Sequence, residues 1–272
     1  MAGPAAGRQN HRSSEGTIPD HFSGVADAYA QYRPHYPASL FEYLATLTPR
    51  HDLAWDVGAG NGQAAVPLAE HYRRVLATDV SARQIANATP HPRVQYRTAA
   101  AQDSGLPAHA ADLITVAQAA HWFDLPAFYR EVELVLAPGG ALVLWTYGTP
   151  RVDGESVQPV FHHWSSTVVG PYWPAERRWV DEGYRTLPFP FAEISPPKLE
   201  LTADWNLREL LGYLDTWSSV GQYRKVRNAD PVPEAAAALA EVWGMAEATR
   251  TVRWPLGLRI GYLRRAGGGP PV

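Results

Sequence analysis

Apolar and polar residues alternate along the first part of the chain in blocks that predict strands and helices following one another. Five short apolar runs are bounded by polar residues, and we expect them to be strands: 53–57, 74–78, 94–97, 111–117 and 141–145. Residues 125–136 have helical spacing, with Asp124 placed to cap the helix, and Ser81 is placed to cap another. Parallel strands need crossover helices, so this alternation predicts a doubly wound α/β core over residues 51–150.

The pattern changes on either side of this core. Residues 21–50 have apolar positions at helical spacing around a proline-rich elbow at 33–37, which predicts an N-terminal helical lid. After Pro150 tryptophan and proline accumulate, and we expect a helical cap over 151–255 that includes a sixth strand at 198–205 and helices at 207–216 and 233–248. A last strand is expected within 256–266. The ends, 1–20 and 267–272, have little to bury and are expected to be disordered tails.

Composition narrows the class of protein. The 272 residues are 46% apolar and 19% charged, which is typical of a folded globular chain. The absence of cysteine excludes disulfides, thiolate nucleophiles and cysteine-ligated metals, and the His162–His163 pair lacks a third ligand, so no metal is expected. A net charge of −3 disfavours nucleic acid and anionic membrane surfaces as partners. No apolar stretch approaches the roughly 20 residues that cross a bilayer. We expect a cytoplasmic protein, and either a monomer or a homodimer.

The strand at 53–57 is followed at once by a glycine turn, Gly58-Ala59-Gly60-Asn61-Gly62. Glycines at this place allow a sharp bend and the close approach of a ligand to the backbone. A dinucleotide fingerprint has its third glycine one position later, so the spacing disfavours NAD and favours a nucleoside without phosphate. Asp79 ends the next strand, where a carboxylate can accept hydrogen bonds from two ribose hydroxyls. Together, the turn and Asp79 predict an adenosine site.

Further motifs make the chain resemble the class I S-adenosylmethionine (SAM)-dependent methyltransferases over residues 22–265. The motifs are 56–62, Asp79, 100–102 before 105–107, 117–123 and 136–140. The resemblance is strongest to the branch that includes trans-aconitate-type methyltransferases of small molecules. That branch has a Tyr-x-x-x-Arg-Pro-x-Tyr-Pro segment, here at 29–37, and a Tyr-Leu-x-Thr-Trp-Ser segment, here at 213–218. The resemblance implies a Rossmann-like, doubly wound, seven-stranded sheet and SAM as cofactor.

The resemblance also implies roles for individual residues. Asp56 would fix the glycine turn, Asp79 would bind the ribose, and Val80 would pack on the adenine. Relatives often have an acidic residue at the position of Gln102. The full set implied for cofactor binding is Tyr29, Arg33, Asp56, Gly58, Ala59, Gly60, Gly62, Asp79, Val80, Ala101, Gln102 and Gln118.

Methyl transfer from a sulfonium is an in-line displacement, so the protein must align the reactants and exclude water. A carboxylate acceptor needs only an arginine or hydroxyl clamp, whereas a phenol, alcohol or amine needs a base such as His121. The sequence leaves this choice open, and a buried histidine more often makes one structural hydrogen bond. The catalytic candidates are His121, Arg33 and Gln118, and the candidate substrate contacts are Trp122, Trp145, Tyr147 and Trp217.

Three other hypotheses about function stay open at this point. The same cofactor site can host chemistry without methylation, such as azetidine-2-carboxylate formation or a pericyclic reaction. The chain could instead be a nucleotide-binding oxidoreductase, or a non-catalytic binding subunit. Arg177 and Arg178 are expected to lie on the solvated surface.

Overall fold

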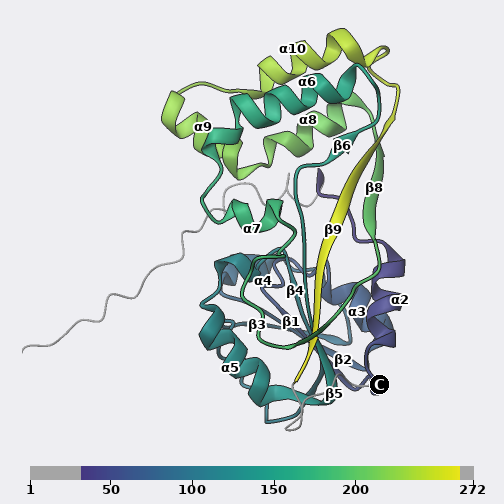
Figure 1. Ribbon diagram of the computed structural model, residues 1–272, viewed down its shortest axis with the longest axis vertical. Helices are drawn as coiled ribbons and strands as arrows, with labels where there is room; N and C mark the ends of the chain where they lie inside the picture. Colours follow the sequence, from purple (N-terminus) through teal and green to yellow (C-terminus); the bar gives the residue numbers. More distant parts are fainter. Residues whose placement is uncertain (1–31, 264–272) are drawn as a thin grey trace, which may run out of the picture.

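The structure is a computed structural model that describes residues 32–263, and its centre is a twisted mixed sheet (Figure 1). Five parallel strands lie in the order β3-β2-β1-β4-β5. Their bounds are Leu53–Val57 (β1), Arg74–Asp79 (β2), Val94–Thr98 (β3), Ala111–Ala117 (β4) and Leu136–Tyr147 (β5). The antiparallel strand β9, Arg250–Tyr262, follows β5, and the short strand β7, Ala192–Ile194, pairs with β9. These seven strands confirm the predicted Rossmann-like α/β sheet.

Helices cover both faces of this sheet. On one face α2 (Ala38–Thr46) and α3 (Ala65–His71) pack on Ala54 and Val143, and on the other face α5 (Leu125–Val135) packs on Trp55 and Leu144. Figure 1 shows α5 on the opposite side of the strands from α2 and α3. Neighbouring residues of a strand point to opposite faces of the sheet. Because helices cover both faces, every residue of β1 is buried.

Two helix starts follow the local chemistry that the sequence predicted. The Ser81 hydroxyl accepts a hydrogen bond from the backbone N–H of Gln84 at the start of α4, Ala82–Ala86. The Asp124 carboxylate does the same for Ala127 at the start of α5. These side chains satisfy backbone donors that the first turn of a helix leaves without partners.

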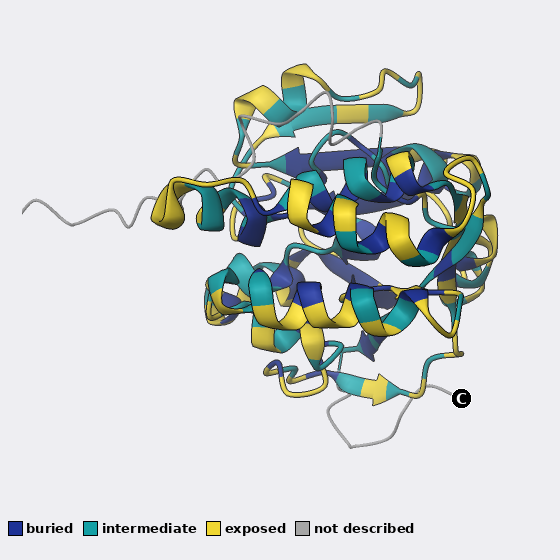
Figure 2. Cartoon of the chain, turned by 90° about the horizontal axis from the view of Figure 1, so that it is seen from above, coloured by how far each residue is buried: buried dark blue, intermediate teal, exposed yellow. Residues whose placement is uncertain are grey.

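A cap of helices lies beyond the carboxyl ends of the parallel strands (Figure 1). Its helices are α6 (Val157–His163), α7 (Arg177–Asp181), α8 (Leu207–Asp215), α9 (Ser218–Arg227) and α10 (Val232–Trp243). A π-helical turn at Trp164–Val168 and 3₁₀ turns at Gly170–Tyr172 and, in the core, Ala120–Trp122 complete the helical elements of the described residues. Seen from above, exposed and buried residues alternate along the helices nearest the viewer (Figure 2).

The strands of the second half differ from the expected arrangement. The predicted sixth strand is β8, Glu200–Trp205, but it pairs with the first half of β9 beneath the cap, as does β6, Arg151–Val152. The place beside β9 in the main sheet belongs to β7. Strand β9 begins at Arg250 rather than 256, because its first half pairs with β8 and its second half with β5. The expected tails and most of the helix before the elbow lie outside the described residues.

Candidate active site

A cavity of about 820 Å³ opens at the carboxyl ends of β1, β2 and β4. Between β1 and β4 the order of the sheet reverses direction, and doubly wound folds bind their ligands at this point. The lining comes from the loops after the strands: 58–61, 63–64, 79–84, 99–102, 117–119 and 122–124, together with Tyr36 and Tyr147. Most residues expected at the cofactor therefore lie together.

The glycine turn has three left-handed glycines, with φ of +68° at Gly58, +56° at Gly60 and +92° at Gly62. A Cβ on Gly58 would lie 2.6 Å from the Cβ of Ala119, and one on Gly62 would lie 2.2 Å from the hydroxyl of Tyr96. A Cβ on Gly60 would meet no atom within 4 Å, although Gly60 lines the cavity. Gly62 thus makes room for Tyr96 and lies outside the cavity lining, contrary to expectation, whereas Gly60 presents bare backbone to the cavity.

Asp79 is fixed by the turn that it faces. Its Oδ2 accepts a hydrogen bond from the backbone N–H of Gly60 at 2.9 Å, and its Oδ1 accepts one from Ser81 at 2.8 Å. A carboxylate oxygen can accept more than one hydrogen bond, so both oxygens keep capacity for a ligand. The next residue, Val80, has 53% of its surface exposed in the cavity wall. An acceptor pair beside an exposed apolar side chain fits a ribose and an adenine ring.

Asp56 lies under the turn and not in the cavity lining. It is fully buried, and its Oδ1 accepts a hydrogen bond from the Thr115 hydroxyl at 2.7 Å. The pKa of Asp56 is raised to about 7, because burial and, less strongly, the charge of Asp79 outweigh the lowering effect of the Thr115 hydrogen bond. The predicted role of Asp56 in shaping the turn fits this position, and direct contact with a cofactor does not.

The loop after β3 forms the far wall of the cavity. Ala101 and Gln102, two of the candidate cofactor contacts, line it together with Ala99 and Ala100. The sequence did not single out Arg83 and Gln84, which α4 brings to the same wall. The Ser81 cap could have indicated these two residues, because a helix that begins shortly after Asp79 places its first turn beside the cavity.

A second cavity of about 90 Å³ adjoins the first, and Gln118, Trp122 and Tyr147 line both. We call it the acceptor cavity. Its other walls come from the elbow before α2, the core and the cap: Arg33, His121, Gly148, Trp173, Pro174, Arg177, Val180, Tyr213, Trp217 and Ser218. Residues of the cap therefore form part of a small cavity that adjoins the larger one.

Gln118 forms a fixed wall between the two cavities. Its backbone is left-handed, with φ of +59°, and its N–H donates to the carbonyl of Trp145. The side-chain amide donates to the carbonyl of Tyr147 at 3.0 Å and accepts from the hydroxyl of Thr146 at 2.6 Å. Because both ends of the amide are engaged, Gln118 shapes the passage rather than moving a proton.

His121 lines the acceptor cavity, and its Nδ1 hydrogen-bonds the hydroxyl of Tyr184 at 2.7 Å. Burial and, to a smaller extent, the charge of Arg177 lower the pKa of His121 to about 4. The imidazole is therefore neutral near pH 7.

Two guanidinium groups line the acceptor cavity. Arg33 lies 5.5 Å from the ring centre of Tyr213, and Arg177 lies 4.0 Å from that of Trp173. Arg177 also donates to Asp181 at 2.7 Å and to the hydroxyl of Thr149 at 3.0 Å. Only 14% of its side chain is exposed, which corrects the expectation of a solvated surface arginine.

The remaining predicted residues separate into two groups. Of the candidate substrate contacts, Trp122, Tyr147 and Trp217 line the acceptor cavity. Trp145 does not, because it is fully buried in the core, with its ring 5.5 Å from that of Tyr36. Tyr29 lies outside the described residues.

Residues 32–263 contain no group of three or more histidine, aspartate or glutamate side chains arranged to hold a metal. None of their helices has the length and apolar character needed to span a bilayer.

A doubly wound sheet with a cavity at the carboxyl ends of its parallel strands is typical of enzymes that bind a nucleotide or nucleoside cofactor. The sequence profile of a family described as "Methyltransferase domain" matches residues 55–144. A Dictyostelium discoideum protein assigned as a methyltransferase is 35% identical over 218 residues, which cover 79% of this chain and 83% of that protein. A solved structure assigned as a type II methyltransferase, from Anaeromyxobacter dehalogenans, is 44% identical with a TM-score of 0.80, covering 85% of this chain and 97% of that one.

A Saccharomyces cerevisiae protein assigned as a SAM-dependent methyltransferase is 26% identical over 157 residues, and the matched part spans 54% of that protein and 53% of this chain. The chain belongs to the class I SAM-dependent methyltransferases, and SAM is its cofactor. The large cavity fits this cofactor. Gly60 has no side chain to block it, both carboxylate oxygens of Asp79 are fixed by backbone hydrogen bonds, and Val80 offers an exposed apolar side chain. The oxidoreductase alternative is thereby excluded.

Proposed function

We propose that the protein transfers the methyl group of SAM to a carboxylate oxygen of a small organic acid. The observation that carries the proposal is the acceptor cavity, which adjoins the cofactor cavity and has both Arg33 and Arg177 in its lining. Guanidinium groups bind carboxylates with charge-assisted, often bidentate hydrogen bonds. A volume of about 90 Å³ limits the enclosed part of the acceptor to a small group.

When bound, SAM supplies a methyl group on a positively charged sulfur. The chain has to hold the adenosine, for which Gly60, Asp79 and Val80 are placed, and to aim the acceptor through the passage walled by Gln118. Arg33 and Arg177 would orient the carboxylate. The rings of Trp122, Tyr147, Trp173, Tyr213 and Trp217 would exclude water from the passage, which strengthens every charge interaction inside it.

The state of His121 supports a carboxylate acceptor over a phenol or an amine. A general base works best when its pKa lies near the working pH. The pKa of His121 is lowered to about 4, so the neutral imidazole is a weak base. A carboxylate arrives ionised and needs no base.

The test is incubation of the full chain with SAM and a panel of small mono-, di- and tricarboxylic acids, with matched phenols and amines. We expect methyl esters and S-adenosylhomocysteine to appear together in mass spectra, with acids only. Release of methylthioadenosine would instead indicate SAM chemistry without methyl transfer. Methylation of phenols or amines but not of acids would contradict the proposal. The cytoplasmic location stays a prediction.

A further inference from the structure

The two ring nitrogens of His121 have different surroundings. Nδ1 hydrogen-bonds Tyr184, whose side chain is fully buried. Of the two ring nitrogens of His121, Nδ1 alone has a hydrogen-bond partner among residues 32–263. The residue itself lines the acceptor cavity. Nε2 is therefore the polar atom that His121 offers to the cavity.

The proton on the imidazole can be assigned from the chemistry of the pair. His121 is neutral near pH 7, so it has one N–H and one nitrogen that accepts. Burial raises the pKa of Tyr184, so its hydroxyl keeps its proton. The hydroxyl of Tyr184 also has a hydrogen bond with the side chain of Thr146, whose own proton goes to Gln118. Thr146 and His121 therefore compete for the one phenolic proton. An imidazole nitrogen accepts a hydrogen bond more strongly than an alcohol oxygen does. Donation from Tyr184 to Nδ1 leaves the imidazole proton on Nε2.

Tyr184 reaches His121 from a strained loop that follows α7. Gly183 and Tyr184 are both left-handed, with φ of +59° and +62°. Residues other than glycine are strained in this conformation, and such strain persists only where the surroundings fix it. The backbone N–H of Tyr184 donates to the carbonyl of Trp179 at 2.8 Å, which fixes one side of the loop.

Arg259 of β9 fixes the other side. Its Nη1 donates to the carbonyl oxygens of Tyr184 at 2.7 Å and Leu187 at 3.1 Å. Its Nε and Nη2 bind the two carboxylate oxygens of Glu193 in β7. The guanidinium thus ties the loop to the edge of the main sheet, and Tyr184 transmits that position to His121.

We propose that Tyr184 and Arg259 are positioning residues that hold His121 as its Nε2–H tautomer, so that His121 donates a hydrogen bond to an ionised oxygen of the acceptor. The charged and titratable groups around His121 are Arg33, Arg177 with its ion-pair partner Asp181, Tyr184 and Tyr213, and the two arginines are likewise donors only. Three donors then converge on one small cavity. A carboxylate can accept hydrogen bonds from them in addition to the partners they already have, whereas a neutral phenol or amine meets no ionised base in the cavity lining.

The tautomer part of this proposal does not depend on the proposed function, but the identity of the acceptor oxygen does. Long-range ¹H–¹⁵N spectra of the ¹⁵N-labelled full chain report the tautomer directly, and the signals missing from His121→Gln identify the residue. We expect the Nε2–H form and no titration between about pH 5 and 8. An Nδ1–H form, or protonation within that range, would overturn the proposal.

A matched pair of variants separates positioning from packing. Tyr129 belongs to the same hydrophobic cluster as Tyr184, and its hydroxyl donates to the carbonyl of Pro188 at 2.6 Å. We expect Tyr184→Phe to let His121 populate both tautomers, with Tyr129→Phe leaving the His121 spectrum unchanged. Arg259→Lys keeps the positive charge but loses the guanidinium group that bonds the loop and Glu193 together. The His121 spectrum of this variant should resemble that of Tyr184→Phe. Equal spectral changes in both phenylalanine variants would show a structural role and refute the assignment.

Kinetics test the contact with the acceptor. With an acid that the panel shows to be methylated, Tyr184→Phe should lower kcat/KM for the acid by roughly 10- to 100-fold and leave KM for SAM unchanged. An unchanged rate would contradict donation from His121 to the acceptor. If no acid in the panel is methylated, the proposed function fails, and the spectra still decide the tautomer.

Discussion

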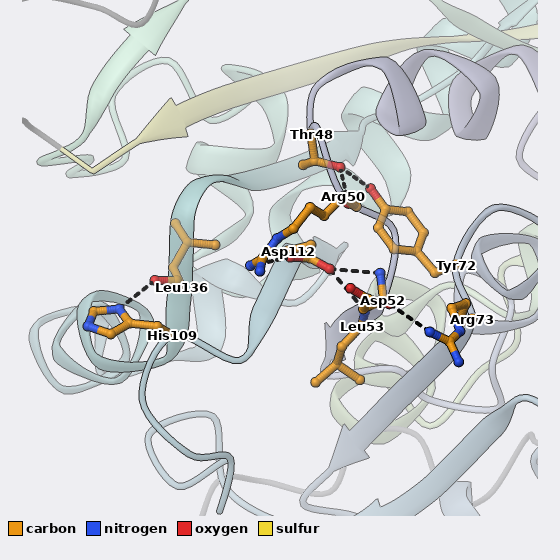
Figure 3. A network of polar contacts seen from close by, with 9 residues as sticks. All are labelled: Thr48, Arg50, Asp52, Leu53, Tyr72, Arg73, His109, Asp112 and Leu136. Atoms are coloured by element: carbon orange, nitrogen blue, oxygen red, sulfur yellow. Dashed lines mark hydrogen bonds and ion pairs between the residues drawn. The ribbon is translucent and has the colours of Figure 1, made fainter.

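The two ends of the parallel sheet use the same kind of residue for opposite purposes. At the amino ends, buried Asp112 accepts hydrogen bonds from the backbone N–H groups of Asp52 at 2.8 Å and Leu53 at 3.2 Å, and it pairs with Arg50 at 2.9 Å (Figure 3). At the carboxyl ends, Asp79 accepts two backbone hydrogen bonds in the same way, but it faces a cavity of about 820 Å³ instead of an arginine.

The two carboxylates differ in the group that binds them besides the backbone N–H donors. Asp112 has an arginine within the fold, so its interactions stabilise the chain before any ligand arrives. Around it, Thr48 donates to the carbonyl of Arg50 and bonds the hydroxyl of Tyr72, which closes this end further (Figure 3). Asp79 keeps its capacity for a ligand. Mutations at the closed end should therefore cost stability, and mutations at the open end should cost binding.

The largest effect is expected from Asp112→Ala. Two backbone N–H groups near the core lose their acceptor, and Arg50 loses its partner, so the free energy of unfolding should fall by about 2 to 4 kcal/mol. Urea denaturation measures this change. Arg73→Ala is the control at the same end, because Arg73 and Asp52 form an exposed pair and its loss should cost less than about 1 kcal/mol. Equal losses for the two variants would show that Asp112 does not secure this end.

Asp79→Ala should act mainly on the cofactor. Loss of a charged acceptor is expected to weaken binding of S-adenosylhomocysteine by about 1 to 3 kcal/mol, or roughly 5- to 150-fold. Equilibrium dialysis measures the affinity, and Asp79→Asn, which keeps one carbonyl acceptor, should lose less. Unchanged affinity in Asp79→Ala would refute the ribose role and the contrast with Asp112.

Gly60→Ala tests the backbone that faces the cavity. At φ of +56° an alanine is strained by about 1 to 2 kcal/mol, although its Cβ would meet no atom of the chain. We expect lower thermal stability and weaker cofactor binding. Gly221→Ala is the control, since this glycine lies in α9 with equal space around it and should gain up to about 1 kcal/mol. A stabilised Gly60→Ala that binds normally would contradict the turn geometry.

Below about pH 4, where the Asp56 carboxyl is neutral in both the folded and the unfolded chain, the smallest effect is expected from Asp56→Asn. The pKa of Asp56 is raised to about 7 in the fold, above the value of an unfolded aspartate near 4, so the folded chain holds a proton that the unfolded chain releases. This contribution to stability is present below about pH 4 and is lost as the pH rises toward 7. Wild-type protein should therefore lose stability relative to Asp56→Asn over that range, measured by denaturation at several pH values. Parallel curves would show that Asp56 has no raised pKa.

Local patterns account for what the sequence predicted. The bounds of β1 and β4, and the caps Ser81 and Asp124, match because an apolar run or a capping side chain is decided by near neighbours in the chain. The cavity residues from Gly58 to Gln102 were found for a similar reason, since the carboxyl ends of adjacent parallel strands meet at one edge of the sheet.

What the sequence missed depends on contacts between distant segments. Arg177 reads as a surface residue by its neighbours, and only the packing of the cap over the core brings it into the acceptor cavity. Trp145 ends an apolar strand, and nothing local shows that Tyr36 covers its ring. Strand β7 has three residues, too few for an alternating pattern, and is defined by its pairing with β9.

The central claim is that the carboxyl ends of the parallel strands bind the adenosyl cofactor while the amino ends are closed. Hydrogen exchange of the full chain, with and without S-adenosylhomocysteine, tests it without any mutation. We predict slower exchange of the backbone amides in 58–61, 79–84 and 99–102, and no change in 50–53 and 109–112. Protection at the amino ends, or no protection at either end, would contradict the account.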